Sequence, residues 1–369
     1  MKKLFLSIFA VAALFSCSKS DVIYDTPSEI GLYPVAQKAT RAAVNGTEYP
    51  SALNMYVFAN AGTATAINDS FEDEVYFANA LFVNKGGVFG GSPTPYYWPN
   101  VKKLIFSGVS ASGNVNKAIG EYTSVPSYSY KRIADDESTT IDESTNSEWQ
   151  ITLENYTPGY GSSANGDNDL LWFPTVGPYA KDHVMGSGND GDVDVEMKHA
   201  CAWITINIKG DGVTGAANTS WTIDKLELDN LSTQGTATLG AAANWDNLAD
   251  AGEVTLQELN PGVKLTSSND ANYKDLDYTD GTADNGEKFY GLVVIPQPTC
   301  NLNITYSYNS QGDIRISETK PVSLALSSNS PWAAGVHYTY NITIGTTEIL
   351  VEPVIVNWTP SSETTDTTL

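Results

Sequence analysis

Apolar and polar residues alternate along most of this chain in short runs, and turn-forming residues separate the runs. The runs are rich in Val, Ile, Thr and Tyr, which favour strands, whereas Gly, Pro, Asn and Asp lie between them. Clear examples are ALNMYVFAN, EWQITLENY, NLNITYSYN and VHYTYNITI. Strands spaced by roughly ten residues are typical of antiparallel sandwiches. The pattern predicts an all-β protein, in which only AAANWDNLADAG is left open for a short helix.

The first residues follow another pattern, MKKLFLSIFAVAALFSCSKSD. Two lysines precede an apolar run that is too short to cross a bilayer, which needs about 20 residues. A charged start, a short apolar centre and small residues at the exit describe a secretory signal. Its end, Leu14-Phe15-Ser16-Cys17, resembles the lipobox of bacterial lipoproteins. We therefore predict a signal peptide over 1–17, acylation of Cys17, and an exported precursor held to a membrane by lipid.

The remaining chain is long enough for two domains of ordinary size. Residues 18–41 form a mixed segment that ends in KATRAA, and strand signals begin after it. We place one β-sandwich at 42–195 and a second at 196–369. The predicted last strand of the second domain is EILVEPVIVNW.

Charge and motifs argue against several classes of function. The formal net charge is −23, from 43 acidic and 20 basic residues, so a basic footprint for nucleic acid is missing. The three histidines, His183, His199 and His337, lie far apart in the sequence, and no catalytic or phosphate-binding motif occurs. The acidic run GNDGDVDVE is better read as a solvated turn than as a calcium site. We predict a protein that is not an enzyme and binds no metal or cofactor.

Two cysteines remain after Cys17. In the strand around Cys201 the alanines and isoleucines share one face, and Cys201 falls on the other face. Cys300 instead shares its face with Leu302 and Ile304. A Cys201–Cys300 disulfide is one alternative in an oxidising compartment, and two separate thiols are the other.

Several motifs together resemble the Bacteroidales fimbrillin family of pilus subunits, which are made as lipoproteins. They are the Cys17 lipobox, YYWP before KKLIFSGVSA, NDLLWF, and a His-x-x-Ala strand at His199 and Ala202. A Trp-x-x-Gly-x-x-Tyr pattern at Trp332, Gly335 and Tyr338 completes the set. Each motif alone is weak, but their order covers nearly the whole chain.

The resemblance implies two tandem transthyretin-like β-sandwiches and assembly into a fimbrium by strand exchange. An N-terminal strand, here residues 18–41 with Ile30 and Leu32 as buried plugs, would be removed by cleavage between Arg41 and Ala42. The groove would then accept a terminal strand of the next subunit. The resemblance also implies adhesion to host or bacterial surface receptors, partnership with accessory subunits, and location at the outer membrane and in the fimbrium.

The C-terminal strand, 349–358, is the expected donor, with Leu350, Val354, Val356 and Trp358 as its buried residues. The alternative is that it is simply the last strand of its own domain. Two other functions stay open: a tip or anchor subunit, and a monomeric lipoprotein that binds glycans through Trp98, Trp172 and Trp245. The sequence identifies neither the receptor, nor the protease, nor the geometry of the fibre.

Overall fold

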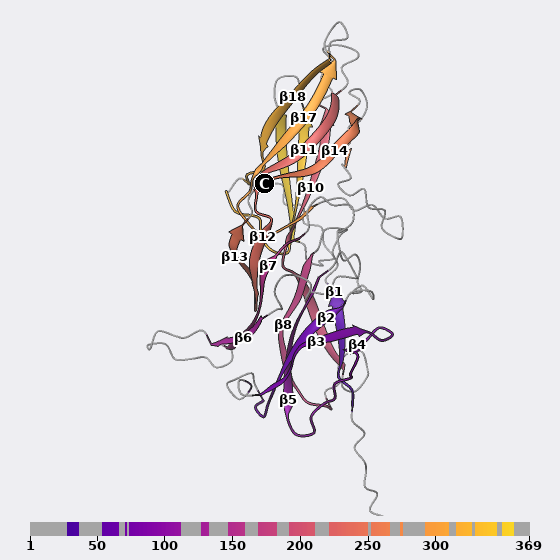
Figure 1. Ribbon diagram of the computed structural model, residues 1–369, viewed down its shortest axis with the longest axis vertical. Coiled ribbons are helices and arrows are strands. Elements are labelled where there is room, and N and C mark those ends of the chain that lie inside the picture. The colour runs from indigo at the N-terminus through magenta and orange to yellow at the C-terminus, as the bar shows by residue number, and fades with distance from the viewer. Residues whose placement is uncertain are drawn as a thin grey trace, which may run out of the picture.

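The described part of the chain is built of β-strands, which confirms the all-β prediction. Figure 1 shows an elongated molecule with the N-terminal strands toward one end and the C-terminal strands toward the other. The described ranges hold no helix that is long and apolar enough to cross a membrane. The computed structural model describes residues 28–36, 54–65, 71, 74–111, 127–132, 147–158, 169–182, 192–210, 221–249, 252–265, 274–275, 292–309, 315–326, 329–344 and 349–357.

Seven strands at the N-terminal end close into a barrel, in the order β1-β4-β3-β2-β5-β8-β9. The strand order is closed because β1 pairs on both sides and leaves no open edge there. Alternate side chains of these strands fill the interior, which we call the barrel core. The strands are β1 (Gly31–Ala36), β2 (Met55–Gly62), β3 (Val75–Asn84), β4 (Phe89–Gly91), β5 (Lys103–Ala111), β8 (Leu170–Tyr179) and β9 (Asp192–His199).

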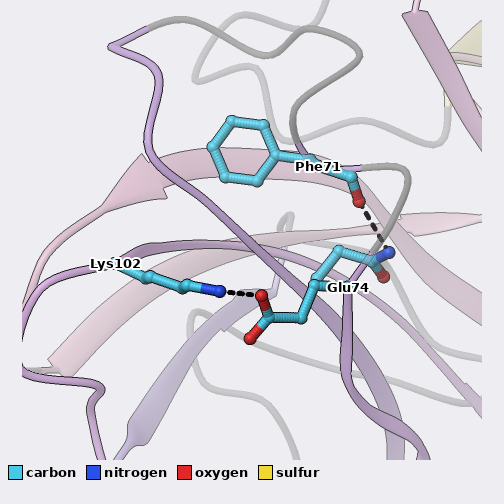
Figure 2. Close-up of polar contacts among 4 residues, drawn as sticks. Phe71, Glu74 and Lys102 are labelled. Atoms are coloured by element: carbon cyan, nitrogen blue, oxygen red, sulfur yellow. Dashed lines mark hydrogen bonds and ion pairs between the residues drawn. The ribbon is translucent and has the colours of Figure 1, made fainter.

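Phe71 and Glu74, which lie between β2 and β3 in the sequence, make side-chain and backbone contacts with the barrel strands and their ends (Figure 2). The Phe71 side chain is fully buried, and its carbonyl accepts a hydrogen bond of 2.8 Å from the Asn60 amide. Gly62 makes this packing feasible, because a β-carbon there would lie 2.7 Å from the Phe71 ring. Beside it, Lys102 forms an ion pair with Glu74, which joins the start of β5 to the start of β3.

The C-terminal half forms the predicted sandwich of two sheets. One sheet has the order β15-β10-β19-β20, with β16 also paired to β10, and the other has the order β14-β11-β17-β18. Ile204, Ile206 and Ile208 of β10 all point into the apolar layer between the sheets, which we call the sandwich core. The strands are β10 (Ala202–Gly210), β11 (Trp221–Leu231), β14 (Gly252–Leu265), β15 (Lys274–Asp275), β16 (Leu292–Val294), β17 (Asn301–Asn309), β18 (Arg315–Ser323), β19 (Val336–Ile344) and β20 (Ile349–Asn357).

A third sheet combines strands from both halves of the sequence. Its order is β13-β12-β7-β6, formed by β6 (Ser127–Arg132), β7 (Ser147–Tyr156), β12 (Gln234–Leu239) and β13 (Ala243–Ala249). The segment AAANWDNLADAG contains β13, so the short helix left open there is not formed. The residue that decides this is Trp245, whose ring packs against a buried apolar cluster and whose indole N–H donates to the Ala200 carbonyl at 2.7 Å.

This cluster, the junction core, lies where the third sheet meets the barrel and the start of β10. It includes Phe58 from the barrel, Leu153 from β7 and Trp203 from β10. The boundary predicted between residues 195 and 196 falls inside β9, not in a connection. The two units therefore share a buried layer. Strand β7 pairs with β12 across the predicted boundary, and β6 pairs with the other edge of β7.

The C-terminal Trp-x-x-Gly-x-x-Tyr motif is explained by packing at the start of β19. Trp332 is buried, and its indole N–H donates to the Tyr340 hydroxyl at 2.8 Å. Gly335 has φ of +68°, a conformation that side chains disfavour, and its N–H donates to the Cys201 carbonyl at 2.8 Å. The Tyr338 hydroxyl accepts from the Ala333 N–H at 2.9 Å. The motif thus fixes β19 against the junction.

Candidate functional site

Strand β1 closes the barrel by pairing with two strands that are not paired with each other. It runs antiparallel to β4 through two residue pairs and parallel to β9 through six, from Gly31 opposite Asp192 to Ala36 opposite Met197. Its partners come from positions far along the chain, and each has β1 on one side and a barrel neighbour on the other. Removing β1 would leave one edge of β4 and one edge of β9 without main-chain partners.

The two predicted plugs, Ile30 and Leu32, both lie in the barrel core. Each is 0% exposed, and the core around them includes Phe89, Val193 and Val195. Full burial of such a side chain stabilises by about 1.5–3 kcal/mol. The next residue of this parity, Pro34, is buried too, whereas Tyr33 between them is 39% exposed. Strand β1 therefore inserts one apolar face into the barrel. If β1 left the barrel, it would expose a slot lined by apolar side chains.

Polar contacts hold the chain just before β1. The Ile30 N–H donates to the Tyr96 carbonyl at 2.8 Å, and the Trp98 N–H donates to the Ser28 carbonyl at 2.9 Å. These bonds extend the pairing onto the YYWP segment, which explains its place in the resemblance. Lys85 and Glu29 form an ion pair at 2.5 Å, with side chains 41% and 42% exposed. Exposed ion pairs contribute little stability, so the main-chain bonds and the two plugs dominate.

Gly31 is required where it stands because its neighbours are close. A β-carbon at this position would lie 2.2 Å from Asp192 Oδ1 and 2.6 Å from Val88 Cγ1. Any larger residue would force the Asp192 side chain to turn aside. The contact between Gly31 and Asp192 is not apparent in the sequence, where Asp192 belongs to the predicted solvated turn, although a glycine inside a strand often marks a close approach. In the structure Asp192 is buried at the start of β9.

The predicted donor strand, β20, is the edge strand of its own sheet in this structure. It pairs antiparallel with β19 from Ile344 opposite Ile349 to Val336 opposite Asn357. The face turned to the sandwich core carries Ile349, Val351 and Ile355. The strand thus completes its own domain here, which is the alternative that the sequence left open.

The residues predicted to be buried in the donor lie on the other parity of β20. Leu350 is 50% exposed and Val354 is partly buried. The side chain of Val356, and Trp358 as a whole, lie outside the described residues, as do Cys17, Arg41 and Ala42. The face predicted to enter a neighbouring subunit is therefore the one that points away from the sandwich core in this structure.

The two cysteines are free thiols, so the Cys201–Cys300 disulfide is not formed. Cys201 is buried in the junction core, and Cys300 packs at the margin of the sandwich core. Burial, aided by the charge of Asp229, raises the pKa of the Cys300 thiol to about 12. Such a thiol stays protonated and unreactive at neutral pH.

Two of the three histidines have structural partners, and His183 lies outside the described residues. His199 Nδ1 lies 2.5 Å from Asp169 Oδ2 in a fully buried pair, and burial raises the pKa of Asp169 despite the neighbouring imidazole. His337 stacks on Trp203 with ring centroids 3.6 Å apart, and its Nε2 lies 2.9 Å from Thr205 Oγ1. Among the described residues no cluster of His, Cys, Asp or Glu has the arrangement of a metal site.

Comparison with known proteins identifies the family. The model of the fimbrillin-like family matches residues 40–358, which is most of the chain. The chain belongs to the fimbrillin-like family. This confirms the resemblance that the motifs indicated. A search of curated proteins gave no significant match.

Solved structures of fimbrial proteins are similar to this one. A fimbrial protein from Bacteroides vulgatus matches with a TM-score of 0.57 and 17% identity, over 90% of this chain and 99% of that chain. At this identity the likeness shows a shared fold. The tip fimbrial protein Mfa3 from Porphyromonas gingivalis, truncated at its C-terminus, matches with a TM-score of 0.33 and 12% identity, over 89% of this chain and 100% of that chain.

Proposed function

We propose that this fimbrillin-like protein is a structural stalk subunit of a bacterial surface fimbrium that polymerises by strand exchange. The observation that supports the proposal most is the position of β1, which precedes the predicted cleavage point at Arg41 in the sequence and closes the barrel on both sides. Once β1 is cut away, the edges of β4 and β9 and the apolar slot between them are available to another strand.

The vacated slot recognises its occupant in two ways. The unpaired N–H and C=O groups of β4 and β9 supply main-chain hydrogen bonds, and the sites of Ile30 and Leu32 select apolar side chains. A second copy of this chain supplies the occupant through its C-terminal strand, 349–358. Because the slot is dry and the contacts are many, such a joint dissociates slowly.

The processing steps in this proposal come from the sequence. Acylation at Cys17 anchors the precursor to the outer membrane, and cleavage between Arg41 and Ala42 releases the lipid together with the 18–41 segment. The mature form then carries no lipid and joins other copies, accessory subunits and surface receptors. The transthyretin-like assignment of both units also belongs to the proposal.

The glycan-binding alternative is disfavoured by the placement of the tryptophans. Trp98 and Trp172 are each 4% exposed. The indole N–H groups of Trp172 and Trp245 donate to the carbonyls of Gly240 and Ala200, at 3.0 and 2.7 Å. Rings that are held in this way do not form an exposed stacking platform for a sugar. A tip or anchor subunit stays the second candidate within the family.

The proposal is tested by cutting the chain after Arg41 and running the unboiled product on a denaturing gel. We expect a ladder of subunit multiples from the cut chain and a single band from the uncut chain. Arg41→Ala, treated with the same protease, is the matched control and should stay monomeric. N-terminal sequencing of the ladder should begin at Ala42. A cut chain that remains monomeric at high concentration would refute the proposal.

A further inference from the structure

The first and last strands of the protein carry the same sequence pattern. Residues 30–36 read IGLYPVA, and residues 349–355 read ILVEPVI. Aligned without a gap, isoleucine, proline and valine coincide at the first, fifth and sixth places, and the third place is leucine in one and valine in the other. Proline is uncommon inside strands because it cannot donate to a ladder, so its shared place is informative.

The two strands also bury the same places of this pattern. In β1 the first and third places, Ile30 and Leu32, enter the barrel core. In β20 the first and third places, Ile349 and Val351, contact the sandwich core. The second place of β20, Leu350, is 50% exposed. The two strands therefore turn apolar residues at the same places of the pattern toward a core.

Strand direction is compatible with exchange between copies. Strand β1 runs parallel to β9, whose last residues lead into the junction core. From the junction, β10 and β19 run parallel, and β19 ends at Ile344 opposite Gly210, the last residue of β10. Figure 1 shows the strands of this sandwich at the end of the molecule opposite to the barrel strands. Only four residues, 345–348, separate β19 from β20. A chain that continues onward from β19 into a second copy's barrel therefore enters with the direction that β1 has.

We propose that β20 of one copy occupies the β1 site of the next copy in the register of this alignment. Ile349, Val351 and Pro353 then take the places of Ile30, Leu32 and Pro34. This inference rests on the proposed function and adds to it the register and the face of the donor. It also reverses the face expected from the sequence, since Leu350 and Val354 point out of the barrel.

The register creates two misfits on the outward face. Leu350 takes the place of Gly31, where Asp192 Oδ1 and Val88 Cγ1 leave no room for a β-carbon. Glu352 takes the place of Tyr33, which lies opposite Asp194, so that two carboxylates face each other. Like charges opposite one another destabilise a strand pair. The donor therefore fits less well than β1, and it cannot displace β1 from an uncut chain.

Cysteine cross-linking tests directly the register of β20 against β9 of the next copy. In the proposed joint, residue 352 of one copy lies opposite residue 194 of the next, within the Cα separation of roughly 4.4–6.8 Å that a disulfide spans. The test variant carries Glu352→Cys with Asp194→Cys. The matched control carries Glu352→Cys with Glu196→Cys, which lies two residues further along β9. The uncut chain with Tyr33→Cys and Asp194→Cys is the positive control for cross-linking efficiency, because these residues already lie opposite each other.

Each variant is cut after Arg41, allowed to polymerise, checked on an unboiled gel, oxidised and then boiled without reductant. We expect a ladder that survives boiling from the 352/194 variant and only background cross-linking from the 352/196 variant. Strong cross-linking at 352/196 in place of 352/194, or a polymer that neither pair cross-links, overturns the register. Failure to form any ladder before oxidation instead overturns the proposed function, and the register with it.

A second measurement uses the misfit at Gly31. Leu350→Gly and Asp192→Ala should each speed subunit addition by about tenfold, in line with the relief of overpacking. Combined, the two changes should give little more than either alone, because both relieve the same contact. Fully additive effects would mean that these residues do not meet, and would contradict the register.

Discussion

Replacing Leu32 by alanine in the uncut chain should loosen β1 without touching any other strand. Leu32 is 0% exposed and lies in the barrel core beside Ile30. Truncating a buried leucine to alanine typically costs 2–5 kcal/mol, from lost burial and the cavity left behind. We take about 3 kcal/mol here, which raises the fraction of molecules with β1 detached by roughly a hundredfold.

Urea denaturation followed by tryptophan fluorescence measures this effect. Trp98 is a suitable reporter because its ring meets Phe106 edge-on in the barrel core and its backbone N–H donates to the Ser28 carbonyl, just before β1. We expect the unfolding midpoint to fall in Leu32→Ala, and cleavage after Arg41 to become faster.

The matched control is Leu350→Ala, the same substitution at a half-exposed position of β20. Surface changes of this kind usually stay within about 0.5 kcal/mol. If Leu32→Ala unfolds at the same urea concentration as the unmodified chain, then β1 is not seated in the barrel, and both proposals lose their basis.

Three further predictions concern the ends of the chain and one histidine. Cys17→Ala should abolish labelling of the precursor by palmitate, and unchanged labelling would exclude Cys17 as the lipidated residue. Deleting residues 349–369 should lower the melting temperature, because Ile349, Val351 and Ile355 cover the sandwich core, and should prevent polymer growth; a normal ladder on an unboiled gel would rule out β20 as the donor. Burial lowers the pKa of His337 to about 4 from its usual 6.5, so the unfolded chain takes up the proton first. Stability should therefore be complete above pH 6.5 and decrease toward pH 4 by up to about 3 kcal/mol, and His337→Gln should flatten that part of the stability curve against pH.

The strands themselves were predictable because their side chains alternate. In β10, the isoleucines at 204, 206 and 208 share a face in the sequence and enter one core in the structure. The segment containing β13 was harder, since AAANWDNLADAG has no strong period. Its conformation depends on Trp245 reaching a cluster built from distant parts of the chain.

The family resemblance led to Ile30 and Leu32, and both are buried, but the surroundings of β1 were not predictable. The two residues are apolar and two positions apart, which agrees with one buried face of a strand. The parallel pairing with β9 and the contact of Gly31 with Asp192 join residues that no local pattern connects. The same holds for the buried pair of Asp169 and His199, which lie thirty positions apart and meet only because β8 and β9 pair.

The sequence alone does not determine which face of the C-terminal strand turns toward the core of its own domain, for a physical reason. The stretch from Ile349 to Asn357 is apolar at most places on both faces, so alternation alone cannot choose between them. Exposure of Leu350 and Glu352 decides the question, and exposure depends on the sheet that the strand joins.

The pairing of β1 with β9 also constrains the order of events during biogenesis. Gly31 is synthesised and exported long before Asp192, about 160 residues ahead of it. Bringing such distant segments together makes folding slow, because the loop must close before the contacts form. The first strand of the barrel is thus among the last to find its place. Under the processing proposed above, a chain cut after Arg41 during that interval would lose the strand before the barrel existed, and we therefore expect productive cleavage to follow folding.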